Sequence, residues 1–202
     1  MSTTTAAALP DIPFTPEPAD AALRPRIPPA LPGADTLAAD APNLPAGPFI
    51  GRESFRCLVR QSFAAAAEGG WHELLISDAD FADWPLGEPA VAAALHEWAR
   101  KTSGRCIVLA RNYDAVPRQH ALFVRWRSQW QHKIECFECP HDMSDEVPSL
   151  LWSPHWALQR VESVRGWGIS GAQARRLKLL RSGMDEWLAR AVPGFPAVTL
   201  GL

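Results

Sequence analysis

Three short apolar runs, separated by segments with helical periodicity, constrain the fold of this chain more than any other feature. The runs have the length of buried strands and cover Leu74–Ile76, Cys106–Ala110 and Ile134–Cys139. Apolar residues recur at helical spacing before and between them, over residues 52–68, 91–104 and 117–130. A helix between two strands returns the chain to the edge where the first strand began, which makes the second strand parallel. The pattern therefore predicts a three-layer α/β fold with a mostly parallel sheet and helices on both faces.

The C-terminal third follows a different pattern. Leu150–Trp152 and Trp156–Val161 are two apolar stretches on either side of Ser153-Pro154-His155, which predicts a hairpin. A last amphipathic helix carries Leu177, Leu180, Met184 and Trp187. The glycines of Gly166–Gly171 are expected to shape the turn before that helix, with Ser170 as its N-cap.

Composition changes abruptly near Pro48. Eleven of the 19 prolines lie in residues 1–48, interleaved with alanine, whereas all nine tryptophans lie beyond that point. A Pro/Ala-rich stretch without an apolar repeat cannot bury enough surface to offset the entropy of ordering it. We therefore expect residues 1–48 to be a disordered tail that tethers the domain or carries a docking motif for a partner protein. Residues 49–202 are expected to form a single α/β domain.

Charge and hydropathy exclude several classes of protein. The net charge of the whole chain is −2, and the tail holds five acidic and two basic residues. The acidic and basic residues of the remaining domain therefore nearly balance. Field-driven binding of polyanions by the whole domain is therefore excluded, and a local basic patch is not. The chain has no apolar run of the ~18 residues that span a bilayer and no secretory signal pattern, so we expect a cytoplasmic protein with reduced thiols.

Short motifs shared with a known family run through residues 50–195. They are Gly104–Leu109, Arg118–His120, Val124–Trp126, His132–Glu135, Leu179–Ser182 and Met184–Trp187. In these motifs the chain resembles an uncharacterised proteobacterial family of degenerate phospholipase D-like domains. The resemblance implies a phospholipase D-like topology.

The catalytic motif that this resemblance implies is missing. Phospholipase D-like enzymes use His-x-Lys with a downstream Asp, but here His132 and Lys133 are adjacent and no other His has Lys two positions later. Adjacent side chains on a strand point to opposite faces, so this pair cannot serve one phosphate. The family's reaction therefore does not carry over, and the scaffold is left as a binding module.

Polar residues follow the predicted strands at their carboxyl ends, where open α/β sheets bind ligands. We take five of them as ligand-binding candidates: Asp78, Asp80, Arg111, Asn112 and Asp114. The three aspartates together suit a divalent cation, because hard cations prefer carboxylate oxygens. Loop aspartates also cap turns and helix starts, so the alternative is a structural role.

Cys136-x-x-Cys139-x-His141 is the most motif-like cluster in the chain. Thiolates and imidazole suit zinc, with His155 or His132 as the distant fourth ligand. The alternatives are a redox dithiol, although such pairs normally lie at a helix N-terminus, and inert buried thiols.

Basic residues surround aromatic ones on the third predicted helix. Arg118, Arg125, Arg127 and Lys133 accompany Trp126 and Trp130, and the last helix adds Arg175, Arg176, Lys178 and Arg181. Single-stranded nucleic acid uses this combination, pairing phosphates with basic groups and stacking bases on rings. The alternative is a solvated helix face opposite an apolar stripe.

These observations favour a non-catalytic α/β binding or protein-interaction domain without a cofactor. The chain has no Gly-x-Ser-x-Gly elbow and no phosphate-binding glycine loop. Two alternatives stay open: a metal-dependent phosphoester hydrolase that uses Asp78, Asp80 and Asp114, and a nucleic-acid-binding accessory protein. A protein partner would bind through the Pro-rich tail or through exposed tryptophan side chains.

Overall fold

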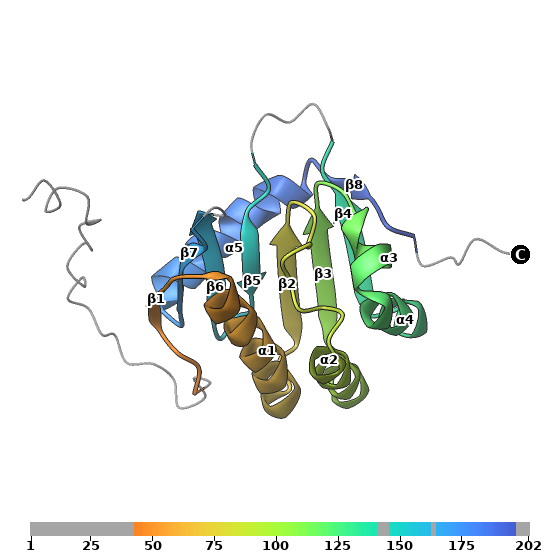
Figure 1. Cartoon of the computed structure of the whole chain (residues 1–202), viewed down its shortest axis with the longest axis horizontal. Helices are drawn as coiled ribbons and strands as arrows, with labels where there is room; N and C mark the ends of the chain where they lie inside the picture. Colours follow the sequence, from red (N-terminus) through yellow and green to blue (C-terminus); the bar gives the residue numbers. More distant parts are fainter. Residues whose placement is uncertain (1–42, 141–145, 163–164, 197–202) are drawn as a thin grey trace, which may run out of the picture. The chain divides into compact units, whose positions relative to one another are not determined.

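The fold is built on one eight-stranded sheet with the strand order β1-β7-β6-β5-β2-β3-β4-β8 (Figure 1). The computed structural model describes residues 43–140, 146–162 and 165–196, which all belong to one unit, Thr36–Leu202. The strands are β1 (Gly47–Phe49), β2 (Glu73–Asp78), β3 (Arg105–Ala110), β4 (Ile134–Glu138), β5 (Ser149–Trp152), β6 (Ala157–Glu162), β7 (Trp167–Gly171) and β8 (Val192–Pro193). The helices are α1 (Arg52–Gly69), α2 (Pro89–Lys101), α3 (Ala115–Gln119), α4 (Ala121–Gln129) and α5 (Ala174–Leu188).

The three strands predicted from the apolar runs are parallel neighbours. Leu74 of β2 lies opposite Cys106 of β3, and Val108 of β3 lies opposite Cys136 of β4. Helix α2 connects β2 to β3, and α3 and α4 connect β3 to β4. The predicted link between helical connections and parallel pairing is confirmed for this half of the sheet.

The expectation of a mostly parallel sheet is wrong for the other half. The pairs β2–β5, β5–β6, β6–β7, β1–β7 and β4–β8 are all antiparallel. The predicted hairpin forms as β5 and β6, and no helix separates β5, β6 and β7 along the chain. A strand that follows its neighbour through a turn must run back along it, so β5–β6 and β6–β7 are antiparallel. The pairs β2–β5, β1–β7 and β4–β8 join strands that are distant in the sequence, and their direction is set by the tertiary fold.

Helices cover both faces of the sheet, as expected. One core lies between the sheet and α1, α2 and α4, and includes Phe55, Trp98 and Trp126. A smaller core lies on the opposite face under α5, and includes Leu75 and Met184 (Figure 1). None of the helices in the described ranges is long and apolar enough to cross a membrane.

The third predicted helix is two helices. Helix α3 ends and α4 begins at His120, which has non-helical dihedral angles (φ −124°, ψ 47°). The buried His120 ring lies 2.9 Å (Nε2) from the carbonyl oxygen of Phe81 and packs against Gly87. This tertiary contact fixes the break, which the apolar pattern alone does not indicate.

The predicted turn at Gly166–Gly171 is instead strand β7. The Ser170 hydroxyl does not cap α5, whose N-cap is Gln173, but donates to the carbonyl oxygens of Pro45 and Gly47. Those bonds hold β1, which begins inside the predicted tail; residues 1–42 of that tail lie outside the described residues. A side chain at Gly168 would overlap Phe49, so the glycine allows β1 to pair closely with β7.

Candidate functional site

The loops after β2, β3 and β4 meet at one edge of the sheet, as the sequence predicted. The backbone N–H groups of Arg111 and Asn112 both donate to the Ala79 carbonyl oxygen. The Arg111 guanidinium donates to the Pro140 carbonyl oxygen at 3.0 Å. Three loops therefore come together at this edge of the sheet. Whether they form a ligand site depends on the direction in which their aspartate carboxylates point.

The Asp78 carboxylate is buried and fully engaged. Its oxygens accept hydrogen bonds from the backbone N–H groups of Asp80 and Phe81 and from the indole Nε1 of Trp84 at 2.9 Å. The Arg160 guanidinium pairs with Asp78 at 3.1 Å, and both side chains are almost completely buried. Asp78 is therefore a structural anchor rather than an open ligand group.

Arg160 links this anchor to the start of α1. Its guanidinium pairs with Asp83 at 2.9 Å and lies over the Phe55 ring, 4.6 Å from the centroid. Asp83 in turn pairs with Arg52 at 2.9 Å. These ion pairs connect β2, β6 and α1, so the cluster stabilises the packing of these three elements.

The carboxylates proposed for a divalent cation are not brought together. The Asp80 carboxylate accepts the backbone N–H of Ala82, which closes a local turn, and Asp114 is exposed at the N-cap of α3. Within residues 43–140, 146–162 and 165–196, no group of three His, Cys, Asp or Glu side chains could hold a metal ion. The hydrolase alternative thus loses the site on which it was based.

The two cysteines of the predicted zinc motif lie on opposite faces of the sheet. Cys136 packs in the core under α4, where Arg127 Nε donates to its Sγ at 3.1 Å, whereas Cys139 packs in the core under α5. Burial raises the pKa of both thiols; the cationic Arg127 opposes this at Cys136. Their separation prevents a shared ion, and His141 lies outside the described residues.

The two other histidines considered as zinc ligands make their ring contacts with tryptophans, not with Cys136 or Cys139. His155 stacks against Trp71, with 5.7 Å between ring centroids, and His132 lies beside Trp130. His132 and Lys133 precede β4 rather than forming part of it, so the expectation that they lie on a strand is wrong. Strand β4 begins at Ile134, which is the first residue in register with β3 and lies opposite Cys106.

The four basic residues predicted to face nucleic acid do not share one environment. Arg118 and Arg125 are exposed, Lys133 is half-buried, and Arg127 is buried. Arg127 turns under α4, with its guanidinium 5.3 Å from the centroid of Phe195. Arg127 is thus a core residue, and its inclusion in a solvated basic face is wrong.

A cluster of rings and cations surrounds the indole of Trp130, which is half-buried at the end of α4. The exposed rings of His96 and His132 lie 5.5 Å and 5.8 Å from it, and Lys133 Nζ lies 5.7 Å from its centroid. Trp130 Nε1 is 3.4 Å from His96 Nδ1. We call these four residues the Trp130 patch; the exposed Arg125 lies five residues earlier in the chain, on α4.

The carboxylate beside this patch is paired with two cations. Glu97, next to His96 on α2, pairs with Arg100 at 2.9 Å and with Lys101 at 3.0 Å. Hydrogen bonds from Arg100 and Lys101 lower the pKa of Glu97 to about 2, so its charge is held by two cations. Lys133 also donates to the Thr102 carbonyl oxygen, which fixes the ammonium group beside the ring.

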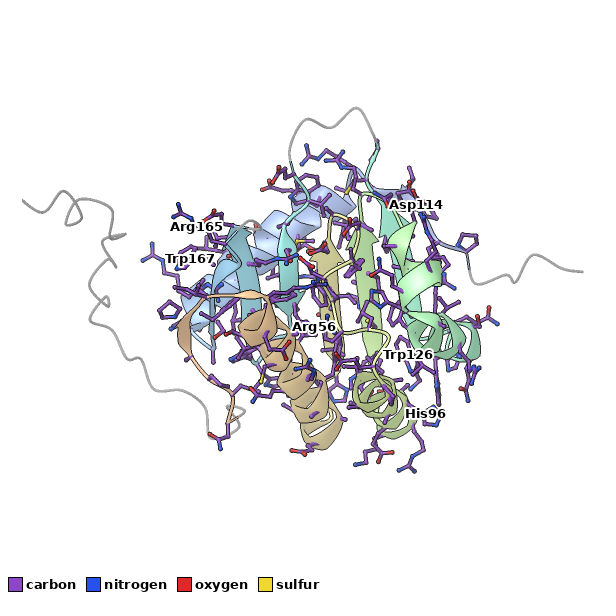
Figure 2. The ribbon with its side chains drawn as sticks, viewed as in Figure 1. Arg56, His96, Asp114, Trp126, Arg165 and Trp167 are labelled. Atoms are coloured by element: carbon purple, nitrogen blue, oxygen red, sulfur yellow. The ribbon has the colours of Figure 1, made fainter. Side chains whose placement is uncertain are left out.

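His96 is the part of the patch that sequence reasoning missed. It lies on α2, more than thirty residues from Trp130 along the chain, and appears there as an ordinary exposed residue opposite Leu95 and Trp98. Packing of α2 against α4, with Trp98 and Trp126 rings 6.4 Å apart, brings His96 to Trp130. Figure 2 shows His96 and Trp126 on these two helices. No spacing within one segment signals this contact.

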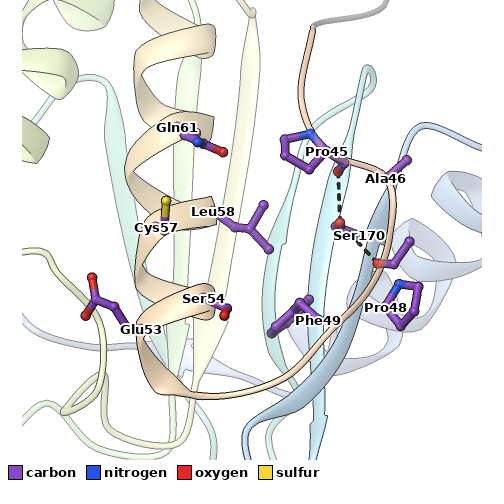
Figure 3. A pocket seen from close by; sticks show the side chains of 11 residues that line it. Pro45, Ala46, Pro48, Phe49, Glu53, Ser54, Cys57, Leu58, Gln61 and Ser170 are labelled. Atoms are coloured by element: carbon purple, nitrogen blue, oxygen red, sulfur yellow. Dashed lines mark hydrogen bonds between the residues drawn. The ribbon is translucent and has the colours of Figure 1, made fainter.

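A second surface feature is an open groove between β1 and α1 (Figure 3). Its volume is about 440 Å³, and Phe49 and Leu58 give it an apolar lining. Ser54, Gln61 and the exposed thiol of Cys57 line it from α1. The groove borders the edge strand β1, where the sheet ends.

Comparison with known proteins gives a likeness of fold alone. No family matches the sequence, and no curated protein matches it. TrmBL2, described as an archaeal chromatin protein with a novel mode of DNA binding, matches 74% of this chain at 14% identity and a TM-score of 0.55. This chain spans about half of TrmBL2, covering 54% of it. NucT from Helicobacter pylori matches 73% of this chain and 97% of its own, at 9% identity and a TM-score of 0.50.

Proposed function

We propose that this chain is a non-catalytic binding domain that holds single-stranded nucleic acid at the Trp130 patch. The observation that carries the proposal is the half-buried indole of Trp130 between two exposed imidazole rings and the Lys133 ammonium group. A base stacks on such a ring, and the neighbouring cations pair with phosphates. Arg125 and His132 are exposed and are the groups that reach the backbone of the ligand.

The surroundings of the patch support a single strand over a duplex. The base faces of a duplex are stacked on one another and cannot reach an aromatic side chain, whereas those of a single strand can. The domain is near charge balance, with 18 basic and 17 acidic residues beyond the tail, so a local patch rather than a whole face must provide the binding.

A non-catalytic role is supported by the state of the acidic residues. Asp78 is occupied by Arg160 and Trp84, and Asp80 by a turn. A general base or metal ligand needs free oxygen lone pairs directed at a substrate; Asp78 uses its oxygens internally, and Asp80 uses one of its two in the turn. The resemblance to degenerate phospholipase D-like domains, with their topology, is part of this proposal, and the mixed sheet with helices on both faces is compatible with it.

The fold likeness to TrmBL2 supports the same ligand class. That protein is described as binding DNA, and this chain shares its fold over 74% of the residues here. At 14% identity the likeness does not transfer a binding mode, so the ligand class rests on the chemistry of the patch.

The test is fluorescence anisotropy of labelled single-stranded DNA and RNA, titrated with the full chain at low and at physiological salt. We expect an affinity that falls steeply with salt, because bound phosphates release counterions. Trp130→Leu keeps an apolar group against the core but removes the stacking surface, and should weaken binding by about tenfold. Arg125→Ala should reduce both the affinity and the salt dependence, and His132→Ala should reduce the affinity.

Arg165→Ala is the matched control. Arg165 is exposed in the turn between β6 and β7, far from His96 in Figure 2, and makes no ion pair with the residues that the structure describes. It removes the same charge as Arg125→Ala and should leave binding unchanged. No binding at low salt, or equal losses in Arg125→Ala and Arg165→Ala, would contradict the proposal. Tighter binding of a duplex would contradict the single-strand assignment.

Peptide binding at the groove between β1 and α1 is a second candidate function. Edge strand β1 ends the sheet, and the apolar side chains of Phe49 and Leu58 lie beside it. An extended segment of a partner protein could add to the sheet there and place apolar side chains in the groove. Attachment of a bulky maleimide at Cys57 would block this binding without touching the Trp130 patch.

A further inference from the structure

The outer face of α5 carries a row of exposed side chains. Leu179 is 65% exposed, one of the most exposed large apolar residues in the described chain. Arg175, Lys178, Ser182 and Glu186 are also exposed there, and none of their side chains makes a hydrogen bond or ion pair within the described ranges. An ideal Cβ placed on Gly183 would meet no atom within 4 Å.

The other two arginines of this helix, Arg176 and Arg181, are half-buried and bind groups of the domain itself. Arg176 donates to the Ile169 carbonyl oxygen at 3.1 Å, and Arg181 pairs with Glu73 and with Asp185. The predicted basic character of the last helix is therefore divided between two faces. The outer face carries Arg175 and Lys178 in its N-terminal half and Glu186 in its C-terminal half.

We propose that this face of α5 is an interface between two copies of the chain, with the two α5 helices packed antiparallel about a twofold axis. Arg175, Leu179, Ser182 and Glu186 follow one another at spacings of four, three and four residues, which places them on one helical stripe. A twofold axis brings the same surface of each copy together, so the stripe must complement itself.

The charge order along the stripe meets this requirement only in the antiparallel arrangement. The midpoint between Arg175 and Glu186 falls at the Leu180–Arg181 peptide bond, and so does the midpoint between Leu179 and Ser182. With the axis at that bond, Arg175 of each copy faces Glu186 of the partner. Leu179 of each copy then lies over the small Ser182 of the other, beside Gly183, and loses its exposure to water.

The expected association is weak. Helix α5 has 15 residues, so it is about 22 Å long and contributes one large apolar side chain per copy. That contact is smaller than the ~1,200 Å² of a stable interface, so the dimer should form in a concentration-dependent way. The two symmetric ion pairs mainly fix the orientation of the helices.

The test is sedimentation velocity of the full chain over about a hundredfold range of concentration. We expect the mean mass to rise from that of a monomer toward that of a dimer. Arg175→Glu and Glu186→Arg should each hold the protein in the monomeric form. Each substitution places two like charges opposite each other, and the twofold axis repeats this repulsion at both ends of the interface. The double variant Arg175→Glu/Glu186→Arg exchanges the two charges and should restore the dimer.

Leu179→Asp is the second variant, and Arg165→Glu is the control of equal charge change outside α5. Leu179→Asp should abolish association, and Arg165→Glu should leave it as in the natural chain. A monomer at every concentration would overturn the proposal, as would a dimer that persists in both single charge variants. Failure of the double variant to restore association, with circular dichroism showing folded protein, would overturn the antiparallel arrangement. Nucleic-acid binding at the Trp130 patch is measured separately and is not altered by any of these outcomes.

Discussion

The four thiols of the chain differ in what surrounds them. Cys57 is exposed on α1, whereas Cys106, Cys136 and Cys139 are buried. Burial raises the pKa of all three buried thiols, and for Cys106 the neighbouring Cys136 adds to this. Only a thiolate reacts rapidly with a disulfide reagent. Burial therefore slows the reaction of these three thiols in two ways, because it blocks access and raises their pKa.

We therefore predict that the folded protein reacts rapidly at one thiol out of four, with a disulfide reagent such as dithionitrobenzoate. The other three should react only after unfolding. The measurement is the amplitude of the fast phase, and Cys57→Ser should remove it. A fast phase that survives this substitution would show that a second thiol is accessible in the folded protein.

The ion pair of Asp78 with Arg160 gives a prediction about stability. Removing one member of a buried pair leaves an uncompensated charge in the core, so Arg160→Met should lower the free energy of unfolding by about 3 kcal/mol. The double variant Asp78→Asn/Arg160→Met should cost less than the sum of the two single changes, because it leaves no unpaired charge. Urea unfolding measures both effects, and Asp114→Asn, at an exposed position, is the control. Additive losses would contradict the direct coupling.

At the scale of elements, α1 and α2 are joined through Glu88. This residue is the N-cap of α2, and its carboxylate accepts hydrogen bonds from Arg56 and Arg60 of α1 at 2.6 Å. Those bonds, with Arg60 the larger contributor, lower the pKa of Glu88 from 4.5 to about 2 in the folded protein. The charged form is thus stabilised by folding.

The sign of the pH dependence follows from this lowered pKa. The stabilisation is complete above the unfolded value of 4.5 and is lost as the pH falls to about 2. We predict that Glu88→Gln costs about 1.5 kcal/mol at neutral pH and that the difference from the natural chain disappears toward pH 2. Unfolding in urea at several pH values measures it. Glu68→Gln, at an exposed position of α1, should show no such trend. A cost for Glu88→Gln that is constant with pH would refute the assignment.

At the scale of the whole molecule, one sheet separates the two hydrophobic cores and belongs to both. Alternate residues of the same strands, such as Leu74 and Leu75 of β2, point into different cores. Neither core can lose its packing while the sheet that forms its wall stays intact. The domain should therefore unfold as a single cooperative unit.

This predicts that thiols from the two cores become reactive at the same urea concentration. Cys136 reports on the core under α4 and Cys139 on the core under α5. Labelling each thiol in a variant that lacks the other cysteines, with circular dichroism as a third probe, measures the transitions. Coincident midpoints are expected, and Cys139 reacting well before Cys136 would mean that α5 detaches independently.

The amino-acid sequence by itself determined three parallel strands, the helical character of the segments between them and one hairpin; it did not indicate the break at His120 or strands β1, β7 and β8. Strands β2, β3 and β4, their helical connections and the β5–β6 hairpin all follow from periodicity, because the period of apolar residues depends only on the geometry of each segment. The meeting of polar loops after β2, β3 and β4 follows as well, since parallel strands place their carboxyl ends at one edge.

Tertiary structure alone decided the remaining strand directions and the environment of each polar side chain. Pairing of β1 with β7 joins residues more than a hundred positions apart, and nothing in either segment specifies the other. Arginine has an apolar stem and a charged end, so the same residue type serves as the buried Arg127 and the exposed Arg125. The contact of His96 with Trp130 depends on how α2 and α4 pack. The separation of Cys136 from Cys139, by contrast, agrees with the alternation of side chains along a strand. Packing is a property of the assembled elements, and a single segment of sequence does not contain it.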